Sequence, residues 1–233
     1  GVNTMAVQAL CHETGIDPEM IRVSVDTTSG HDTGMTTASR ATSLMCNAII
    51  DACVELKSDI RCYGLDQLWG RKYKGKWGVD WTTKSSDRGQ PQQTHYSYSY
   101  ATQIVALDDQ GYVKKIVAAH DAGKIFNPTM FEGQIEGSIH MGLGYAIAEN
   151  LPMTEGRLDS LKLRDCGILR AKEMPEMEII GIEVPDTYGP YGGKGVGEIG
   201  LVPTAAAVAN ALKQFDGQRR TTLPIEVSSR RRK

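Results

Sequence analysis

The residues best suited to chemistry lie in a glycine-rich stretch that holds a single carboxylate. Residues 189–212 read GPYGGKGVGEIGLVPTAAAVANAL, and Glu198 stands among the glycines. Glycine-rich turns that lead into a helix usually bind an anion through bare backbone N–H groups. A turn that carries its own negative charge therefore needs an explanation other than simple anion binding.

Spacing argues against a P-loop at this place. The P-loop pattern is GxxxxGK[ST], in which the final hydroxyl binds magnesium. Around Gly193 and Lys194, the first glycine position holds Tyr188 and the hydroxyl position holds Gly195. We therefore set the phosphate-loop interpretation aside.

Residues 195–200 read GVGEIG and so match the dinucleotide-binding pattern GxGxxG. A predicted strand precedes the match and a predicted helix follows it, as that pattern requires. However, the strand ends at Pro185, ten residues before the motif, although the turn should be immediate. Glu198 would also place a negative charge beside a pyrophosphate, which costs a few kcal/mol at low dielectric.

A third interpretation gives the carboxylate a chemical role. The glycines would let the backbone approach a large ligand closely, and Glu198 would act as a general base. The structural alternative is that Glu198 caps the helix that begins near Pro203. Glu198 lies five residues before that proline, which is too far for an N-cap or a capping box. We therefore favour catalysis.

A second candidate binding segment is rich in hydroxyl groups. Residues 26–39, DTTSGHDTGMTTAS, consist of turn formers and lead into the predicted helix SRATSLMCNAIIDACVEL, with Ser39 as the expected N-cap. A hydroxyl-rich helix N-terminus is suited to an anion. Simple N-capping explains the same residues.

Composition places the chain among ordinary soluble globular proteins. It has 233 residues, 40% hydrophobic and 23% charged, with a net charge of −2, which argues against nucleic-acid or membrane partners. The five cysteines form no CxxC pair, which favours a reducing cytoplasm over a disulfide framework. The five histidines show no HxxxH or HxH spacing, so no metal held by protein ligands is expected. The chain starts with neither a Met nor a signal peptide, and we expect it to be a fragment of a longer one.

Mixed strands and helices without strict alternation predict an α+β fold. The expected domains are 1–65, a helix–strand–loop–helix lobe with the cofactor loop; 66–94, an irregular connection; 95–225, the hairpin, long helix, catalytic loop and closing helix; and 226–233, a basic tail. The expected secondary-structure elements begin with a helix, Val2–Glu13, that ends at Gly15, and a strand, Ile21–Val25. Further along the chain we expect a hairpin that turns at Asp109–Gly111, a long helix from Pro128, a buried strand, Met177–Pro185, and a helix from Pro203. Glycines 133 and 137 share one helix face, where close packing is expected.

Three segments, in order, resemble the molybdenum hydroxylases, the xanthine dehydrogenase and aldehyde oxidoreductase group. Residues 189–212 resemble the C-terminal signature of that family. HDAGKIFNPTMFEGQIEGSIHMGLGYAIAEN resembles its D-x-G-x-x-x-N-P…E-G-Q-I-E-G…G-x-G-Y-A segment. GVNTMAVQALCHETGIDPEMIRVSVDTT…TTASRAT resembles the segment that follows its Gly-Gln-Gly turn, so the resemblance runs from Gly1 to about Pro224.

The resemblance implies roles for individual residues. Glu198 would be the general base beside the molybdenum, where burial could raise its pKa to a useful value. Gln134 would form a hydrogen bond on the pterin side. The remaining implied cofactor-binding residues are Gly195, Val196 and Gly197 beside the metal and dithiolene, and Thr37, Ala38 and Ser39 at the pterin phosphate or pyrophosphate, with Arg40 and Thr42 as weaker additions.

The resemblance also implies cofactors and partners. The cofactor would be molybdopterin with molybdenum, with the cytosine dinucleotide as an alternative form. The 2Fe-2S and FAD groups are expected on other parts of the chain or complex. The expected partners are the rest of the molybdenum lobe, the iron–sulfur and flavin modules, and a small-molecule substrate, with a homo-oligomer left open.

The expected activity is hydroxylation of a purine-like N-heterocycle with oxygen from water. The alternatives are an aldehyde oxidoreductase of the same family, or a non-catalytic domain that binds the cofactor or has a structural role. Glu198 within its glycine frame favours an enzyme, because a non-catalytic copy has no use for a carboxylate there.

Overall fold

The structure is a computed structural model that describes residues 1–31, 33–84, 86–89 and 91–225. The predicted basic tail, residues 226–233, lies outside the described residues. The chain forms two compact units. The first unit comprises Gly1–Ser99, Ala122–Asn127 and Glu183–Gly195, and the second comprises Tyr100–Asp121, Pro128–Ile182 and the described residues from Val196 onward.

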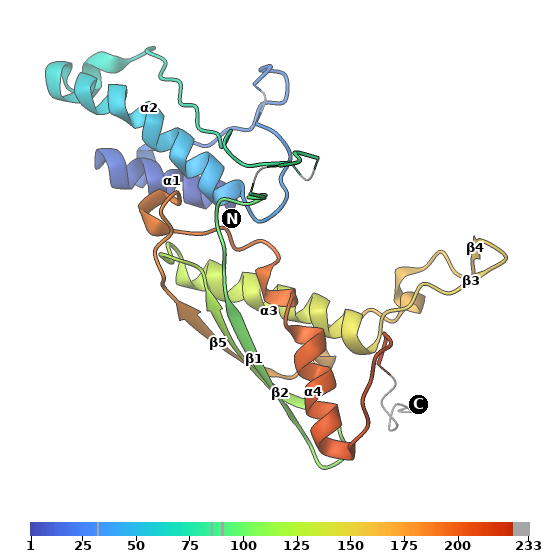
Figure 1. Cartoon of the computed structure of the whole chain (residues 1–233). Coiled ribbons are helices and arrows are strands. Elements are labelled where there is room, and N and C mark those ends of the chain that lie inside the picture. Colours follow the sequence, from blue (N-terminus) through green and yellow to red (C-terminus); the bar gives the residue numbers. More distant parts are fainter. Residues whose placement is uncertain (32, 85, 90, 226–233) are drawn as a thin grey trace. The chain divides into compact units, whose positions relative to one another are not determined.

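Two helices, α1 (Val2–Thr14) and α2 (Ala41–Tyr63), lie side by side in the first unit (Figure 1). Their buried side chains are small: Ala9, Ser43, Cys46 and Cys53. The predicted end of α1 is confirmed, because Gly15 has a φ of 72° and donates its N–H to the carbonyl of Cys11. Glycine adopts this left-handed conformation without steric cost.

The predicted strand Ile21–Val25 is wrong. The turn before it is present as η1 (Pro18–Met20), capped by Asp17 Oδ1, which accepts from the Glu19 N–H at 2.9 Å. Residues 21–26 then run without regular structure. An alternating pattern forms a strand only where another strand pairs with it, and in the described part of the chain none does. After α2 comes a short helix, η2 (Leu65–Leu68), and most of the predicted connection 66–94 is irregular.

The second unit contains a three-stranded sheet in the order β1-β2-β5. Strands β1 (Ala101–Leu107) and β2 (Val113–Asp121) form the predicted antiparallel hairpin, and β5 (Glu176–Ile182) pairs with β2 in parallel. In the hairpin turn, Asp108 Oδ1 accepts from the N–H groups of Gln110 and Tyr112, both at 2.9 Å. Gly111 supplies the positive φ, 83°, that such a turn requires.

Helices α3 (Pro128–Ile147) and α4 (Thr204–Asp216) pack against the sheet and against each other (Figure 1). Leu143 and Ala146 of α3 form a buried core with Val208 and Leu212 of α4. The α+β architecture predicted from the sequence is therefore confirmed. Among the described residues, no helix has both the length and the apolar character needed to cross a membrane.

The remaining elements are short. Strands β3 (Met153–Thr154) and β4 (Arg157–Leu158) form a small hairpin. Single 3-10 turns are also present: η3 (Leu163–Cys166), η4 (Ala171–Glu173), η5 (Pro190–Gly192) and η6 (Ile199–Leu201). The turn η6 follows Glu198 directly and is packed against α3.

Two expectations about packing in the second unit are wrong. Strand β5 was expected to be buried, but it lies at the sheet edge, where Ile180 and Ile182 are 40% and 42% exposed. Among the described residues, nothing lies within 4 Å of a Cβ built on Gly133 or Gly137. The close approach to α3 occurs at Gly142 instead, where a Cβ would lie 2.7 Å from Thr204 Cβ.

Candidate functional site

The predicted cofactor residues Thr37, Ala38 and Ser39 form a tight turn in the first unit. The Arg40 N–H donates to the carbonyl of Thr37 at 3.2 Å, and both Ala38 and Ser39 have a φ of 52°. A left-handed conformation costs a non-glycine residue about 1–2 kcal/mol. Strain of this kind is concentrated at ligand sites. Thr37 and Ala38 are exposed and Ser39 is half-buried.

The prediction that Ser39 is the N-cap of α2 is wrong, because its positive φ excludes the extended conformation of an N-cap. Arg40 occupies the cap position instead, and its side chain makes no cap hydrogen bond. The Arg40 guanidinium donates from Nε and Nη2 to the carbonyl of Met35, at 3.2 and 2.9 Å. The first turn of α2 therefore keeps N–H groups without a side-chain cap, at the positive end of a 23-residue helix.

Gly195 lies directly against the backbone of Ser39. A Cβ built on Gly195 would lie 1.3 Å from the carbonyl oxygen of Ser39 and 2.5 Å from its carbonyl carbon. No side chain can occupy that space, so only glycine allows the contact. The structure thus brings together two predicted site residues that are far apart in the sequence, within the first unit.

The start of the glycine-rich loop is anchored by Tyr191, which sequence analysis did not single out. Its hydroxyl donates to Glu13 Oε1 at 2.7 Å, and its ring lies 4.4 Å from that of His12, centroid to centroid. Burial and the bond to Glu13 raise the pKa of the Tyr191 phenol. Like Ala38 and Ser39, Tyr191 is a non-glycine residue with a left-handed backbone, at a φ of 52°.

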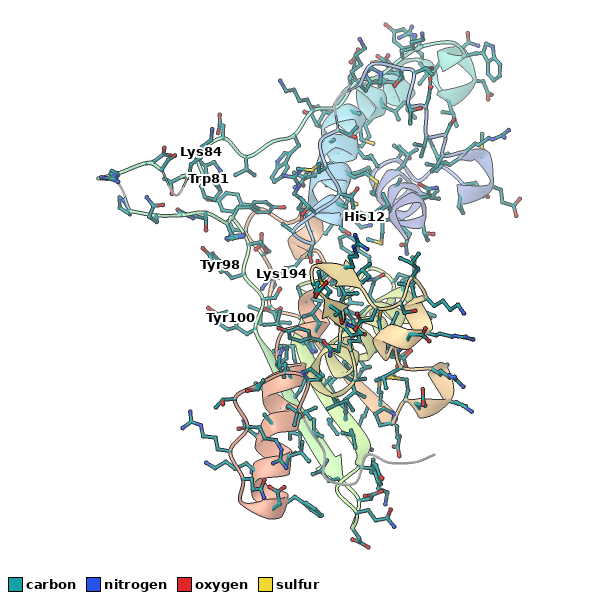
Figure 2. All side chains as sticks on the ribbon, turned by 90° about the vertical axis from the view of Figure 1, so that its right-hand side faces the viewer. His12, Trp81, Lys84, Tyr98, Tyr100 and Lys194 are labelled. Carbon is teal, nitrogen blue, oxygen red and sulfur yellow. The ribbon has the colours of Figure 1, made fainter. Side chains whose placement is uncertain are left out.

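Lys194 is a second anchor of the loop, and it is only 8% exposed. Its Nζ donates to the carbonyl of Tyr98 at 2.8 Å, and Figure 2 shows the two residues close together. Its backbone N–H donates to the carbonyl of Ala122 at 2.9 Å. A buried cation needs such partners, and the only signal for this role in the sequence was the Gly-Lys pair. These anchors hold the chain where it reaches Gly195.

The second part of the loop, Val196–Gly200, belongs to the second unit. The carbonyl of Gly197 accepts from Gln134 Nε2 at 3.0 Å and lies 3.4 Å from Ser138 Oγ. Gln134 lies on α3, so the helix holds the peptide bond that joins Gly197 to Glu198. The structure therefore assigns Gln134 a contact with the loop, in addition to the implied contact with a pterin.

Glu198 stands at the N-cap position of η6, with φ and ψ of −126° and 13°, and its side chain makes no cap hydrogen bond. The cap position of α4 is held by Pro203. The carboxylate is therefore not explained as a cap of either η6 or α4. Glu198 is exposed on this chain, so the described residues do not bury its carboxylate.

Two further polar residues near the loop were missed in the sequence. Gln103 on β1 and His120 on β2 are buried, and Gln103 Nε2 donates to the carbonyl of Gly200 at 2.7 Å. The available signal was a polar residue at an inward position of each strand. Within the described ranges, no cluster of three or more His, Cys, Asp or Glu side chains could hold a metal ion.

The family model described as molybdopterin cofactor-binding domain matches residues 1–70 and 67–175. A putative xanthine dehydrogenase molybdenum-binding subunit of Escherichia coli K12 is 33% identical over 115 residues, covering 48% of this chain and 15% of that subunit. The aldehyde oxidoreductase of Megalodesulfovibrio gigas is 28% identical over 227 residues, covering 90% of this chain and 25% of that protein.

Among solved structures, the aldehyde oxidoreductase of Desulfovibrio desulfuricans superposes with a TM-score of 0.74 at 29% identity, covering 94% of this chain and 25% of that one. The chain thus spans a quarter or less of the length of each of these proteins. The family match ends at residue 175, before the glycine-rich loop.

Proposed function

This chain belongs to the xanthine dehydrogenase and aldehyde oxidoreductase family of molybdenum hydroxylases, and we propose that it carries the general base of such an enzyme. The proposed reaction is hydroxylation of an electron-poor carbon in a purine-like N-heterocycle, with oxygen from water. Glu198 is the proposed base. The chain forms part of the large molybdenum-binding subunit, and the rest of that lobe is proposed to complete the site.

The residues present fit a molybdopterin. A pterin with a phosphate group needs hydrogen-bond donors and close access to backbone. The N-terminus of α2 provides N–H groups without a side-chain cap, next to the exposed Thr37 and Ala38. Glycine at 195 lets two backbone segments meet without a side chain between them. We propose Thr37, Ala38, Ser39 and the Gly195–Gly197 backbone as the groups that hold the cofactor, either as molybdopterin itself or in its cytosine dinucleotide form.

When bound, the molybdenum cofactor would supply the redox chemistry of the reaction by taking up the two electrons of the substrate C–H bond that breaks. The chain supplies the base: the Glu198 carboxylate accepts the proton that water loses as its oxygen bonds to the substrate carbon. A base of this kind must be held within hydrogen-bond reach of the proton it takes. The observation that carries the proposal is the 3.0 Å bond from Gln134 Nε2 to the carbonyl of Gly197, because it fixes the residue before Glu198.

Electrons must leave the site through groups that this chain does not contain. We propose iron–sulfur (2Fe-2S) and flavin (FAD) modules, on other parts of the protein or on partner subunits, as the acceptors. A cytoplasmic location fits the cysteines, all five of which are free thiols in the part of the chain that the structure describes.

The substrate class is tested with the full-length protein that contains this chain. We expect turnover of hypoxanthine and xanthine, measured as reduction of an electron acceptor, ahead of benzaldehyde. Oxidation of an aldehyde is the second candidate, favoured by the 90% of this chain that aligns with an aldehyde oxidoreductase. Turnover of benzaldehyde alone would contradict the purine assignment.

A further inference from the structure

A buried cluster of polar side chains lies next to the turn that follows Glu198, within the second unit. It consists of Gln103 on β1, His120 on β2 and Thr204 at the start of α4, which are 9%, 0% and 0% exposed. Burial of polar groups is unfavourable unless each finds a hydrogen-bond partner. The partners of these side chains therefore indicate what the cluster does.

The orientation of the Gln103 amide follows from its neighbours. Gln103 Nε2 lies 2.7 Å from the carbonyl oxygen of Gly200, and Gln103 Oε1 lies 2.8 Å from Thr204 Oγ1. The opposite orientation would place two acceptor oxygens 2.7 Å apart, with no proton between them. The NH₂ group therefore faces Gly200, and the Thr204 hydroxyl donates to the amide oxygen.

The same reasoning assigns the tautomer of His120. Gln103 Nε2 also lies 3.2 Å from His120 Nε2, and an amide nitrogen only donates. His120 Nε2 must therefore accept, which leaves the proton on Nδ1 and the ring neutral. In the described part of the chain, Nδ1 is buried without a hydrogen-bond partner. His120 thus contributes an acceptor that helps direct the Gln103 NH₂ group.

Gly200 is held from the opposite side as well. A Cβ built on Gly200 would lie 2.6 Å from Ser138 Cβ and 3.2 Å from the carbonyl oxygen of Ile135, so α3 contacts its α-carbon directly. Its carbonyl meanwhile accepts from Gln103 and lies 3.2 Å from Thr204 Oγ1. The residue cannot shift toward α3 and is tied to β1 on its other side.

These contacts fix the backbone on both sides of Glu198, at the Gly197 carbonyl directly before it and at the Gly200 carbonyl two residues after it. Gly197, before it, is held by Gln134 of α3, and Gly200, after it, is held by Gln103 of β1. The turn between them is closed by the Leu201 N–H, which donates to the carbonyl of Glu198 at 3.4 Å. A movement of Gly200 is therefore transmitted to the backbone of Glu198.

We propose that Gln103 is a positioning residue for Glu198: its amide, directed by Thr204 and His120, holds Gly200 and with it the backbone that presents the carboxylate. The inference rests on the proposed function of Glu198. Gln103 does not touch the substrate or the cofactor in this mechanism. Its effect is to keep the base within reach of the proton it accepts.

The test compares Gln103→Met with Ile116→Val in the full-length holoenzyme that contains this chain. Met preserves length and burial but cannot donate to Gly200, whereas Ile116 is fully buried on the same sheet and lies outside the cluster. Gln103→Met should keep its molybdenum and lose about tenfold to a hundredfold in kcat, since a misplacement of about 1 Å can have that effect. KM should change much less. Ile116→Val should lower Tm and leave kcat unchanged.

Amide hydrogen exchange gives a readout that does not depend on turnover. Gln103→Met should accelerate exchange in the peptide covering residues 196–203, and Ile116→Val should not. If Gln103→Met does not fold, Thr204→Val replaces it, because loss of the hydroxyl releases the amide oxygen and should produce the same pattern. Unchanged exchange at 196–203 in the folded variant would overturn the proposed role.

Glu198→Gln and the double variant Gln103→Met/Glu198→Gln separate the inference from the proposed function. If Gln103 acts through Glu198, the double variant should be no slower than Glu198→Gln alone. A further loss equal to that of Gln103→Met alone overturns the positioning role. If Glu198→Gln keeps the parent kcat, the proposed function fails and the inference fails with it. A slow Glu198→Gln beside an unaffected Gln103→Met overturns the inference alone.

Discussion

Gln134 and Gly197 are joined by a 3.0 Å hydrogen bond from the side-chain nitrogen of one to the backbone carbonyl of the other. The donor lies on α3, and the acceptor directly precedes Glu198. The residue that resembles a cofactor ligand is therefore also a support for the proposed base. This relationship makes the chemistry of the loop testable one residue at a time.

The most direct prediction concerns Glu198. Glu198→Gln in the full-length enzyme should keep the fold and the cofactor, because the amide is isosteric with the carboxylate and the flanking glycines are unchanged. An amide cannot accept the proton, so turnover should fall by ~10²–10⁴-fold or more, with much less effect on substrate affinity. Molybdenum content and single-turnover reduction measure both effects.

Glu149→Gln, just after the end of α3, is the matched control. This substitution should leave the molybdenum content and the single-turnover rate nearly unchanged. If Glu198→Gln retains its molybdenum and still reduces at more than about a tenth of the parent rate, Glu198 is not the base, since a general base contributes more than that.

Gly195→Ala should disrupt the contact between the glycine-rich loop and Ser39. The added Cβ would lie 1.3 Å from the Ser39 carbonyl oxygen, so one of the two backbone segments must move. We expect loss of molybdenum from the purified full-length variant, measured by metal analysis, together with a lower Tm. Gly78→Ala is the control, because nothing among the described residues lies within 4 Å of its Cβ. Normal molybdenum in Gly195→Ala would contradict the proposed holding role.

The 233-residue chain, expressed by itself, should purify without molybdenum. Its proposed cofactor residues Thr37 and Ala38 and its proposed base Glu198 are exposed, and half of an enclosing site leaves a long polar ligand in contact with water. Metal analysis of the isolated chain is the measurement. Near-stoichiometric molybdenum would show that this part alone is sufficient to hold the cofactor.

His120 should make stability depend on pH. Burial lowers the pKa of His120 below its ordinary value of 6.5, so the unfolded chain takes up a proton at a pH where the folded chain does not. Stability should therefore fall as pH drops below 6.5 toward the folded-state pKa, and it should be insensitive to this group above 6.5. Urea unfolding of the folded protein from pH 8 to about 5 measures the slope.

His120→Gln removes the titrating group and should flatten that slope, whereas His95→Gln, at an exposed position, should leave the slope unchanged. Identical slopes for the parent and His120→Gln would show that His120 is not held neutral.

Much of the proposed site could be predicted because its residues lie in long motifs. The turn at Thr37–Ser39, the long helix bearing Gln134 and the loop bearing Glu198 were all named from the sequence. The contacts that support them could not be. Tyr191 carries no local signal of function, and the sequence signals for Lys194, Gln103 and His120 are weak, since the role of each residue is defined by a partner distant in the chain.

Local signals were sufficient for the α-helices and for the hairpin. Gly15 marks the end of α1 and Pro128 marks the start of α3. The hairpin follows from two alternating segments around Gly111. These features could be predicted because helix caps and tight turns depend on a few adjacent residues.

Tertiary structure decided which strands pair and which glycines are tightly packed. Ile21–Val25 found no partner strand among the described residues, and β5 paired with β2 across a long connection. Gly142, not Gly133, meets Thr204, because the face of a helix that another element contacts depends on where the chain returns and not on the local sequence.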